Sequence, residues 1–401
     1  MTRPAPDFLW GAATSPHQVE GNNLNSDAWA REYFGPGREP SGDACDSYHR
    51  YGEDMRLLAD AGLTAYRFGV EWARIEPVPG HVSRAELAHY RRMIETAQRL
   101  GLEPVVTLHH FTSPNWFAQE GGWSGERAIE RFGNYVQAVT GILDGVKWIC
   151  TMNEPNMLAV MEPLSRQLLS EDDGGTKKWT SPTVEGAVHP VLPEPDPQAG
   201  RRFIEAHHAA RDLLKKHTDA AIGWTVACQA LTATPGNEGK LRELRYGYED
   251  LYLEAARGDD FVGVQSYSSQ SVDENGIVPH PPGPDTTLTG QAYRPDAIGI
   301  AVRHVWETTG GVPILITENG IATADDTRRI RYTTEALGHL FAAIDDGIDV
   351  RGYLHWSALD NYEWGHWEPT FGLIAVDRET FERRPKPSLA WLGEVARRGR
   401  P

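Results

Sequence analysis

The chain has 401 residues, a formal net charge of −17, 40% hydrophobic residues and thirteen tryptophans. This hydrophobic content is enough for a large core. The acidic balance disfavours nucleic acid or an anionic membrane surface as a partner, because both bind basic faces. Cys45, Cys150 and Cys228 lack the spacing of a disulfide framework or a zinc site. No apolar stretch resembles a secretory signal or a membrane span, so we expect a reducing, cytoplasmic setting.

Eight apolar, strand-like runs alternate with segments of helical periodicity along the chain. The runs are Phe8–Thr14, Thr64–Val70, Pro104–His109, Lys147–Met152, Ala221–Ala227, Phe261–Gln265, Pro313–Thr317 and Gly352–Trp356. Strand–helix alternation of this length predicts parallel strands, and eight units predict a closed (β/α)8 TIM barrel rather than an open doubly wound sheet. No Gly-x-Gly-x-x-Gly follows the first run, which disfavours a dinucleotide cofactor.

Two of the helices between these runs have clear sequence signals. One begins at Ser83, with Glu86 three residues later in a capping-box pattern, and its apolar residues keep to one face until Gly101. The other runs through Ile129 and Val139, which lie on one face at helical spacing. Both segments therefore predict amphipathic helices that cover the barrel.

The residues beyond a minimal barrel fall mainly in two segments. Leu164–Arg201 follows the fourth run and is rich in Asp, Glu, Gly and Pro, and Ser268–Pro295 follows the sixth. Loops this long in a compact domain are commonly lids or binding loops, or else disordered. We find no internal repeat or linker, so we expect residues 1–401 to form a single barrel domain with long βα loops.

Two glutamates each stand directly after an apolar run. Glu154 follows the fourth run and Glu318 the seventh. In a (β/α)8 barrel the chemistry lies at the carboxyl ends of the strands, so both carboxyls are expected to face one cleft. Two such carboxyls, one ionised and one protonated, are what cleavage of a glycosidic bond requires. Four other polar or aromatic residues also lie at or near run ends: Arg67, His110, Tyr267 and Trp356.

Ordered motifs resemble those of glycoside hydrolase family 1, the β-glucosidase family, over essentially the whole chain. The matching stretches are Phe8 to Thr14, Gln18 to Gly21, Asp46 to Arg50, Tyr66 to Phe68, Glu71-Trp72, Thr151 to Pro155, Ile316 to Gly320, Gly352 to Ser357, Asp360 to Trp364, Phe371 to Leu373 and Pro385 to Pro387. The resemblance implies a (β/α)8 barrel, in agreement with the strand–helix alternation. It also implies hydrolysis of β-glycosides with retention of the anomeric configuration.

By this resemblance, Glu318 matches the family's nucleophile and Glu154 its general acid/base. A retaining enzyme holds the two carboxyls only about 5–5.5 Å apart, so both do not ionise easily and one stays protonated. Arg67 matches an arginine that would keep Glu318 ionised, and Tyr267 would donate a hydrogen bond to it. Once Glu318 becomes an ester, the pKa of Glu154 should fall and allow it to act as a base.

The resemblance also implies a set of sugar-binding residues. An apolar sugar face on an indole, with hydroxyls facing amide, imidazole and carboxylate groups, suits an amphipathic ligand. Asn153 matches the residue that bonds the 2-hydroxyl, and Trp356 matches the aromatic platform beneath the ring. Four further residues match positions that bind glycone hydroxyls: Gln18, His110, Glu363 and Trp364.

Several stretches depart from the family pattern. His109-His110-Phe111 replaces the usual Tyr-His-Trp, and Gln265-Ser266-Tyr267 replaces Asn-Tyr-Tyr. The segment between Trp364 and Phe371 is one residue shorter than usual, and the loop after Glu154 shows little likeness to the family. We expect these changes at the mouth and rim of the site, where they bear on the aglycone more than on catalysis.

Three functions remain to be compared. The first is an exo-acting retaining β-glycosidase on a neutral sugar, β-D-glucoside before galactoside or fucoside; the Glu363 carboxylate would repel a 6-phosphate. The second is a transglycosylase with an alcohol acceptor, and the third a non-catalytic sugar-binding barrel. The expected partner is a small β-glycoside, without metal, cofactor, nucleic acid or membrane, and the sequence does not determine an oligomeric state. No metal is expected because the adjacent pairs His109-His110 and His207-His208 point apart.

Overall fold

Eight parallel strands close into a barrel in the computed structural model, which describes residues 7–34, 39–161 and 192–401. The strands are β1 (Leu9–Ala13), β2 (Ala65–Gly69), β3 (Glu103–Thr107), β4 (Trp148–Asn153), β5 (Ala221–Ala227), β7 (Val262–Gln265), β10 (Ile314–Asn319) and β11 (Val350–Trp356). They follow one another around the ring in chain order, and β11 closes it by pairing with β1. The predicted (β/α)8 barrel is confirmed, and each of the eight predicted runs supplies one strand.

The register of the strands brings particular residues level at their carboxyl ends. Ala13 at the end of β1 pairs with Trp356 on β11 and with Arg67 on β2. Across the ring, Glu318 on β10 pairs with Gln265 on β7. Because all eight strands run the same way, these ends share one face of the barrel, the face where active sites of this fold lie.

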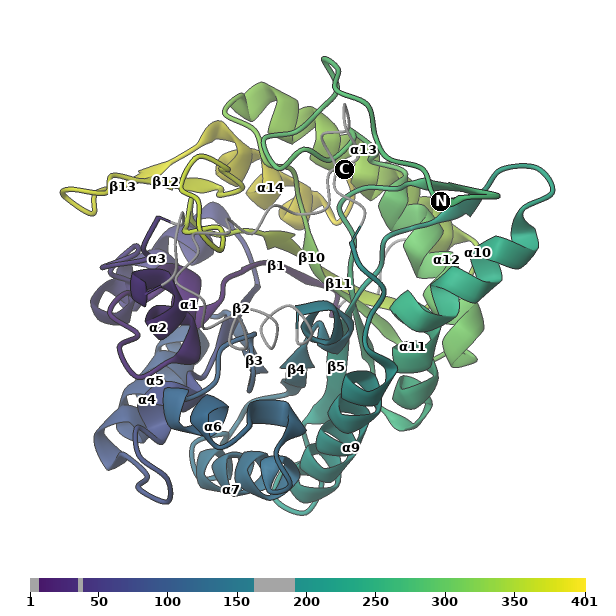
Figure 1. Ribbon diagram of the computed structural model, residues 1–401. Coiled ribbons are helices and arrows are strands. Elements are labelled where there is room, and N and C mark those ends of the chain that lie inside the picture. Colours follow the sequence, from purple (N-terminus) through teal and green to yellow (C-terminus); the bar gives the residue numbers. More distant parts are fainter. Residues whose placement is uncertain (1–6, 35–38, 162–191) are drawn as a thin grey trace.

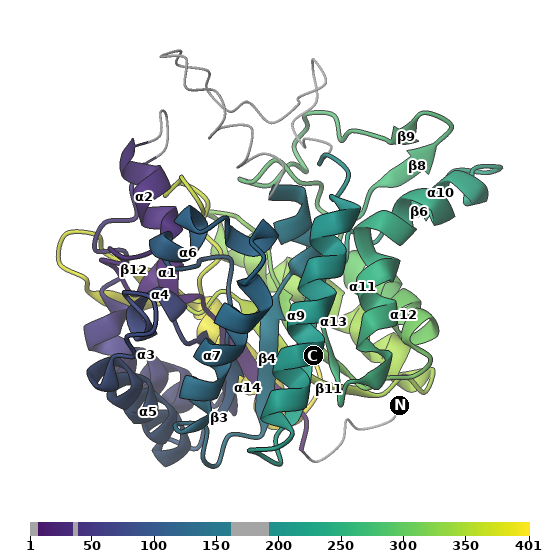
Figure 2. The same ribbon diagram turned by 60° about the horizontal axis from the view of Figure 1, so that its bottom comes forward.

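Helices surround the strands, as Figures 1 and 2 show. The outer helices are α3 (Ser47–Ala61), α5 (Arg84–Arg99), α7 (Ala128–Thr140), α9 (Pro197–Leu214), α11 (Leu251–Ala255), α12 (Ala297–Thr309), α13 (Asp326–Asp345) and α14 (Pro387–Arg398). Shorter helical elements are α1 (Pro16–Val19), α2 (Asp27–Phe34), α4 (Trp72–Ile75), α6 (Asn115–Gln119), α10 (Glu238–Arg245), η1 (Gly122–Ser124), the π-helical η2 (Tyr246–Asp250), η3 (Ala256–Gly258) and residues 155–161. Within the described ranges, none of the helices has the length and apolar character needed to cross a bilayer.

The two helices predicted from sequence signals are present. Helix α5 starts after Ser83, whose side chain accepts a hydrogen bond from the backbone N–H of Glu86 at 3.3 Å. The Glu86 carboxylate accepts instead from the hydroxyl of Tyr48 on α3, at 2.8 Å, so it links two outer helices. Helix α7 buries Phe132 and Val136 against the barrel.

Alternation of side chains along the strands divides the hydrophobic core into two layers. One layer fills the inside of the barrel and includes Leu9, Val105, Phe261 and Leu315, each at most 9% exposed. The other lies between the strands and the helices and is the larger of the two. The interior is therefore a packed core below the strand ends, which leaves the carboxyl end of the barrel for polar groups.

The segment predicted as a long loop at Ser268–Pro295 contains two short strands. These are β8 (Ser271–Asp273) and β9 (Gly276–Ile277), which form a small sheet with β6 (Thr232–Ala233). Figure 2 shows this sheet and α10 projecting beyond the outer helices. A second small sheet pairs β12 (Ile374–Val376) with β13 (Arg383–Pro385).

The other predicted loop, Leu164–Arg201, lies largely outside the described residues. Its last part is not a loop, because Pro197 to Arg201 form the start of α9, capped by Asp196. The Asp196 carboxylate accepts hydrogen bonds from the backbone N–H groups of Gln198 and Ala199, which ends the loop and begins the helix.

Tyr135 on α7 ties together the ends of two strands that reach the polar end of the barrel. Its buried hydroxyl lies 2.8 Å from the carbonyl oxygens of Val70 and Leu108, the residues that follow β2 and β3, and shares its proton between them.

We expect Tyr135→Phe to lower the free energy of unfolding by about 1–3 kcal/mol, since two buried carbonyls lose their donor. Urea denaturation measures this loss. Tyr246→Phe, at a site 51% exposed, is the control and should change stability by less than about 0.5 kcal/mol; equal stabilities for the two variants would contradict the proposed tie.

Candidate active site

The carboxylate of Glu318 is surrounded by hydrogen-bond donors. It lies near the end of β10 and is 4% exposed. Arg67 reaches its Oε1 at 2.5 Å, and the amide nitrogen of Gln265 donates to the same oxygen at 2.8 Å. The hydroxyl of Tyr267 donates to Oε2 at 2.5 Å. Three donors, one of them cationic, favour the ionised form of this carboxyl.

Arg67 is itself fully buried and holds its position through several strands. Its guanidinium donates to the hydroxyl of Thr107 on β3 at 3.0 Å and to the side-chain oxygen of Asn153 on β4, besides Glu318. A buried guanidinium needs a counter-charge, and Glu318 is the carboxylate in contact with it. The contacts expected of Arg67 and Tyr267 with Glu318 are both present.

Glu154 stands directly after β4 with a different environment. Its backbone has φ +44°, in the left-handed region, and its N–H donates to the carbonyl of Thr225 on β5 at 2.9 Å. This conformation turns the chain from the strand into the helical residues 155–161. The half-buried carboxyl receives no hydrogen bond from the described residues, in contrast with that of Glu318.

The two carboxyls influence each other's protonation. Burial, together with the negative charge of Glu318, raises the pKa of Glu154 well above its usual range. Burial also raises the pKa of Glu318, but Arg67 and the hydroxyl of Tyr267 oppose that rise. A proton shared by this pair therefore resides on Glu154, and Glu318 keeps the charge.

Gln265 is the contact that the sequence interpretation missed. Its side-chain nitrogen donates both to Glu318 and to the side-chain oxygen of Asn153, each at 2.8 Å, and it is 1% exposed. The expectation that the departure at Gln265 lies on the rim is therefore wrong for this residue. Gln265 pairs with Glu318 between β7 and β10, and this pairing could have indicated the contact. The sequence alone does not give the register of two strands whose paired residues are 53 positions apart.

Asn153 stands between the two glutamates in this network. Its side-chain oxygen accepts from Arg67, Gln265 and the hydroxyl of Thr225, while its buried side-chain nitrogen has no partner in the structure. An amide with a saturated oxygen and a free donor presents that donor to whatever enters the site.

Gln18 and Glu363 form a second polar pair at the same end of the barrel. The side-chain nitrogen of Gln18, on α1, donates to Glu363 at 3.2 Å and to the carbonyl of Tyr362 at 2.8 Å. Asn361 and the indole of Trp356 also donate to Glu363, at 3.0 and 3.3 Å. Burial nevertheless raises the pKa of Glu363 to about 8.

Aromatic rings line the region between these polar groups. Trp356 at the end of β11 lies 5.9 Å from the ring of His110, with 25° between the planes. Burial and the charge of Arg67 lower the pKa of His110 far below its usual range, so the imidazole is neutral, and its buried Nδ1 has no partner in the structure. Phe111 lies against both His110 and Trp364. Nine of the ten predicted site residues thus fall into two groups joined by contacts, one around Glu318 and one around Glu363 and Trp356. The tenth, Glu154, interacts with Glu318 through its charge.

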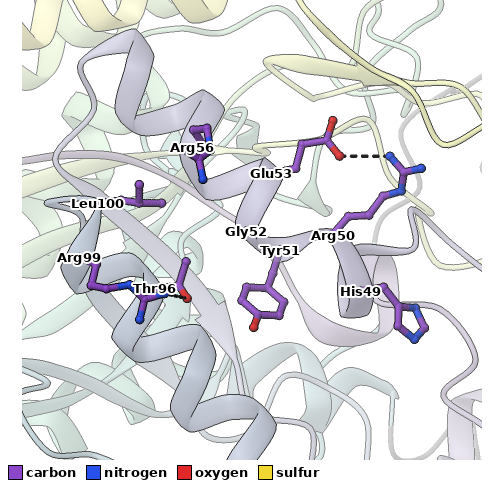
Figure 3. A pocket seen from close by; sticks show the side chains of 9 residues that line it. All are labelled: His49, Arg50, Tyr51, Gly52, Glu53, Arg56, Thr96, Arg99 and Leu100. Carbon is purple, nitrogen blue, oxygen red and sulfur yellow. Dashed lines mark hydrogen bonds and ion pairs between the residues drawn. The ribbon is translucent and has the colours of Figure 1, made fainter.

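Two hollows elsewhere on the molecule do not contain these residues. One, of about 450 Å³, lies between α3 and α5 and is lined by His49, Arg50, Tyr51, Gly52, Glu53, Arg56, Thr96, Arg99 and Leu100 (Figure 3). The other, of about 570 Å³, includes Phe8, Leu102 and Lys147, near the amino ends of the strands. Neither hollow is lined by Glu154 or Glu318. In the described part of the chain, no three His, Cys, Asp or Glu side chains gather in a way that could hold a metal ion.

Comparison with known proteins agrees with this geometry. The model of glycosyl hydrolase family 1 matches residues 2–171 and 253–400. The chain belongs to glycosyl hydrolase family 1. It is therefore a glycoside hydrolase that cleaves β-glycosides with retention of configuration, as the sequence predicted.

Relatives of this family 1 enzyme match it over nearly its whole length. Thermostable β-glucosidase B of Thermobispora bispora is 31% identical, over 98% of this chain and 90% of the relative. β-Glucosidase A of Thermotoga maritima is 29% identical, over 97% of each. Neither name indicates a transglycosylase or a non-catalytic binder, and the comparisons give those two alternatives no support.

Solved structures of the family have the same fold. The structure of β-glycosidase BGL167 is 43% identical with a TM-score of 0.86, over 99% of this chain and 98% of that one. The family 1 β-glucosidase of Thermotoga maritima is 25% identical with a TM-score of 0.85, over 100% and 99%. That enzyme was also solved in complex with glucoimidazole and with galacto-hydroximolactam.

The mutual influence of the two carboxyls predicts a measurable pKa change. In Glu318→Gln the negative charge next to Glu154 is removed, so the pKa of Glu154 should fall towards its ordinary value. Titration of ¹³C-labelled carboxyls by NMR would show this shift, with the Glu154 signal assigned through Glu154→Gln. Glu249, a buried carboxyl whose raised pKa of about 6 does not depend on Glu318, is the internal control. An unchanged pKa at Glu154 would show that the carboxyls do not interact.

Proposed function

We propose that this family 1 enzyme removes terminal non-reducing β-D-glucosyl residues, with Glu318 as nucleophile and Glu154 as general acid/base. The observation that carries the proposal is the asymmetry of the two carboxyls. Glu318 accepts three hydrogen bonds, one from a buried arginine, whereas Glu154 accepts none from the described residues and has the more strongly raised pKa. Such a pair supplies one charged and one protonated carboxyl at neutral pH.

In the first step a carboxylate oxygen of Glu318 forms a bond to the anomeric carbon. The bond from that carbon to the aglycone oxygen breaks, and the proton of Glu154 passes to the leaving oxygen. The products are a glycosyl ester on Glu318, a free alcohol and an ionised Glu154. Esterification removes the negative charge that raised the pKa of Glu154, so Glu154 becomes stable as a carboxylate.

In the second step Glu154 takes a proton from water, and the water oxygen bonds to the anomeric carbon. The ester bond breaks and Glu318 regains its charge beside Arg67, Gln265 and Tyr267, whose hydrogen bonds favour its departure as a carboxylate. Two displacements at one carbon restore the original anomeric configuration. Water and glycoside are consumed, and both protein carboxyls return to their starting state.

Unpartnered polar atoms support the proposed contacts with the glycone. The side-chain nitrogen of Asn153 and Nδ1 of His110 are buried without a partner in the structure, and sugar hydroxyls would satisfy both. The carboxyl of Glu363 and the amide of Gln18 supply further hydrogen bonds, and we place them at the 4- and 6-hydroxyls. The indole of Trp356 forms an apolar floor for the sugar ring.

The preference for a neutral glucoside over a 6-phosphoglucoside has a different physical reason from the one given by the sequence. The sequence argument assumed that an ionised Glu363 repels a 6-phosphate, but with a pKa of about 8 this carboxyl is mainly protonated at pH 7. The groups that bond it are Asn361, Trp356 and Gln18, which are all neutral. A phosphate at this position would have no cation among these contacts, so a neutral hydroxymethyl group suits them better. The names of the relatives favour glucoside, and the complex of one relative with galacto-hydroximolactam keeps galactoside as a second candidate.

We also propose that residues 1–401 act as one domain. The layer between strands and helices extends from Phe8 to Val395 as a single hydrophobic cluster, which supports this organisation. A cytoplasmic location remains a proposal as well. It is supported by Cys45, Cys150 and Cys228, which are free and buried.

The covalent step predicts a trapped intermediate. Incubation with 2,4-dinitrophenyl 2-deoxy-2-fluoro-β-D-glucoside should add one fluoroglucosyl group. The fluorine slows both displacements, but the dinitrophenolate leaving group speeds the first, so the glycosyl ester accumulates. Intact-mass measurement detects the adduct, and peptide mapping should place it on Glu318. Glu318→Gln serves as the control and should remain unlabelled. A label on another residue would reject Glu318 as the nucleophile.

The acid role of Glu154 predicts a dependence on the leaving group. For Glu154→Ala, kcat/KM should fall by about 10²–10⁴-fold on glycosides of alkyl alcohols, which need a proton to depart. On 2,4-dinitrophenyl β-glucoside, whose phenolate leaves unaided, the fall should be less than about tenfold. Initial rates on the two substrates give the comparison. Equal losses on both would contradict the role of Glu154 as the acid.

A further inference from the structure

Two consecutive residues of α1 hold two consecutive residues of the loop that follows β11. Gln18 donates to the Glu363 carboxyl at 3.2 Å, and the imidazole of His17 stacks on the indole of Trp364 with 5.5 Å between ring centres and 13° between planes. The sequence interpretation placed Gln18, Glu363 and Trp364 in the sugar site, but it gave no role to His17. Residues 361–367 are called the Trp364 loop below.

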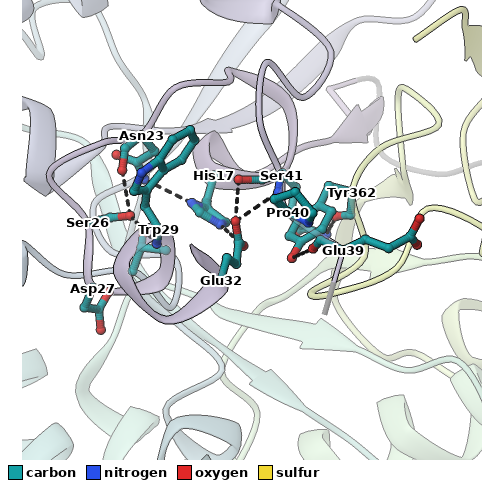
Figure 4. Close-up of polar contacts among 12 residues, drawn as sticks. His17, Asn23, Ser26, Asp27, Trp29, Glu32, Glu39, Pro40, Ser41 and Tyr362 are labelled. Atoms are coloured by element: carbon teal, nitrogen blue, oxygen red, sulfur yellow. Dashed lines mark hydrogen bonds and ion pairs between the residues drawn. The ribbon is translucent and has the colours of Figure 1, made fainter. Parts of the chain in front are cut away.

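His17 is fixed from behind by two buried polar residues. Its Nε2 lies 2.7 Å from Oε1 of Glu32 on α2, and the side-chain nitrogen of Asn23 lies 3.2 Å from its Nδ1. All three residues are at most 6% exposed. Figure 4 shows His17 between Asn23 and Glu32. With both ring nitrogens engaged, the plane of the imidazole is determined by groups that do not contact a sugar.

Glu32 is in turn held on its other side, so the support continues into the Trp364 loop. Its Oε2 accepts from the backbone N–H and hydroxyl of Ser41, at 2.9 and 2.6 Å. Two residues before Ser41, Glu39 accepts from the hydroxyl of Tyr362 at 2.8 Å and from the backbone N–H of Trp367 at 3.0 Å. Glu32 thus holds His17, which stacks on Trp364, and it also holds Ser41, which lies two residues after the Glu39 that bonds Tyr362 and Trp367.

The indole of Trp364 contacts two aromatic rings of the described residues, and of these two the ring of His17 lies parallel to it. Trp364 is half-buried and has φ +47°, a conformation uncommon for a bulky side chain. The second ring is that of Phe111, which meets the indole edge-on, with 5.2 Å between ring centres and 70° between planes. Without the two hydrogen bonds that fix the plane of the His17 ring, the indole has no parallel neighbour of defined orientation.

We propose that His17 and Glu32 are positioning residues that set the enzyme's preference for a glycone with a hydroxymethyl group at C5. They contact no sugar; they act by holding Trp364, and with it the neighbouring Glu363, at the 6-hydroxyl. The inference rests on the proposed sugar-binding role of these two residues. It predicts that loss of His17 weakens recognition of the hydroxymethyl group while leaving the Glu154–Glu318 pair in place.

The test compares 4-nitrophenyl β-glucoside with 4-nitrophenyl β-xyloside, which lacks the hydroxymethyl group but has the same leaving group. For His17→Phe, which keeps an aromatic face and removes both hydrogen bonds, kcat/KM on the glucoside should fall about tenfold or more. On the xyloside the fall should be less than about threefold, so the glucoside-to-xyloside ratio drops. Glu32→Gln keeps the size of the carboxyl side chain and should lower the ratio in the same direction, which keeps the test available if His17→Phe does not fold.

His207→Phe is a matched control elsewhere in the barrel. His207 is also a buried histidine that stacks on a tryptophan, Trp224, at 4.2 Å and 18°, and its Nε2 lies 3.0 Å from Asp259. Its loss should lower the melting temperature as the loss of His17 does. The glucoside-to-xyloside ratio should stay the same for His207→Phe, because this histidine contacts no residue of the Trp364 loop.

Trp364→Ala separates the inference from the function on which it rests. If Trp364→Ala leaves the ratio unchanged, the sugar-binding role proposed for Trp364 fails. If Trp364→Ala lowers the ratio but His17→Phe and Glu32→Gln do not, the positioning role is overturned while that of Trp364 stands. In the double variant, His17→Phe should add no further drop in ratio to Trp364→Ala, and an additive drop would show that His17 acts by another route.

Discussion

The ion pair between Arg67 and Glu318 is the constraint on which the site depends. A guanidinium with no solvent contact is tolerable only with a counter-charge and with its remaining donors satisfied, and Glu318, Thr107 and Asn153 meet both needs. Because the arginine bonds one carboxyl directly, the second carboxyl, Glu154, is left half-buried and forms no ion pair with any described residue. The different chemistry of two identical side chains follows from this unequal distribution of one positive charge.

The barrel makes this arrangement possible by bringing distant residues level. Arg67 and Glu318 are 251 positions apart in the sequence, yet each lies near the carboxyl end of its strand. Because all strands of the closed ring are parallel, their carboxyl ends lie on one face of the barrel. Polar residues at these ends therefore come close together whatever their separation in the sequence. The packed inner layer below them, with Leu315 and Val105, excludes water from one side of the pair.

Local signals were sufficient for much of this structure, and the exceptions have a common cause. The apolar runs indicated all eight strands, and Ser83 indicated the start of α5, because burial and capping act over a few residues. Gln265 was assigned to the rim, and His17 was given no role, because their contacts depend on register and on loops that meet only in the folded chain. Position after an apolar run indicated Glu154 and Glu318, and the family resemblance supplied their roles, but the unequal hydrogen bonding of the two carboxyls needed coordinates.

The backbone conformations of Phe111, Glu154 and Trp364 limit how this enzyme can be improved. Each is a non-glycine residue in the left-handed region, which costs of order 1–3 kcal/mol, and all three belong to the candidate active site or contact it. Glycine would relax these positions, but it would delete the ring or carboxyl that each one presents. Stabilising substitutions should therefore be sought in the outer helices and surface loops. At these three residues the φ angle that costs stability is the one that positions the side chain in the site.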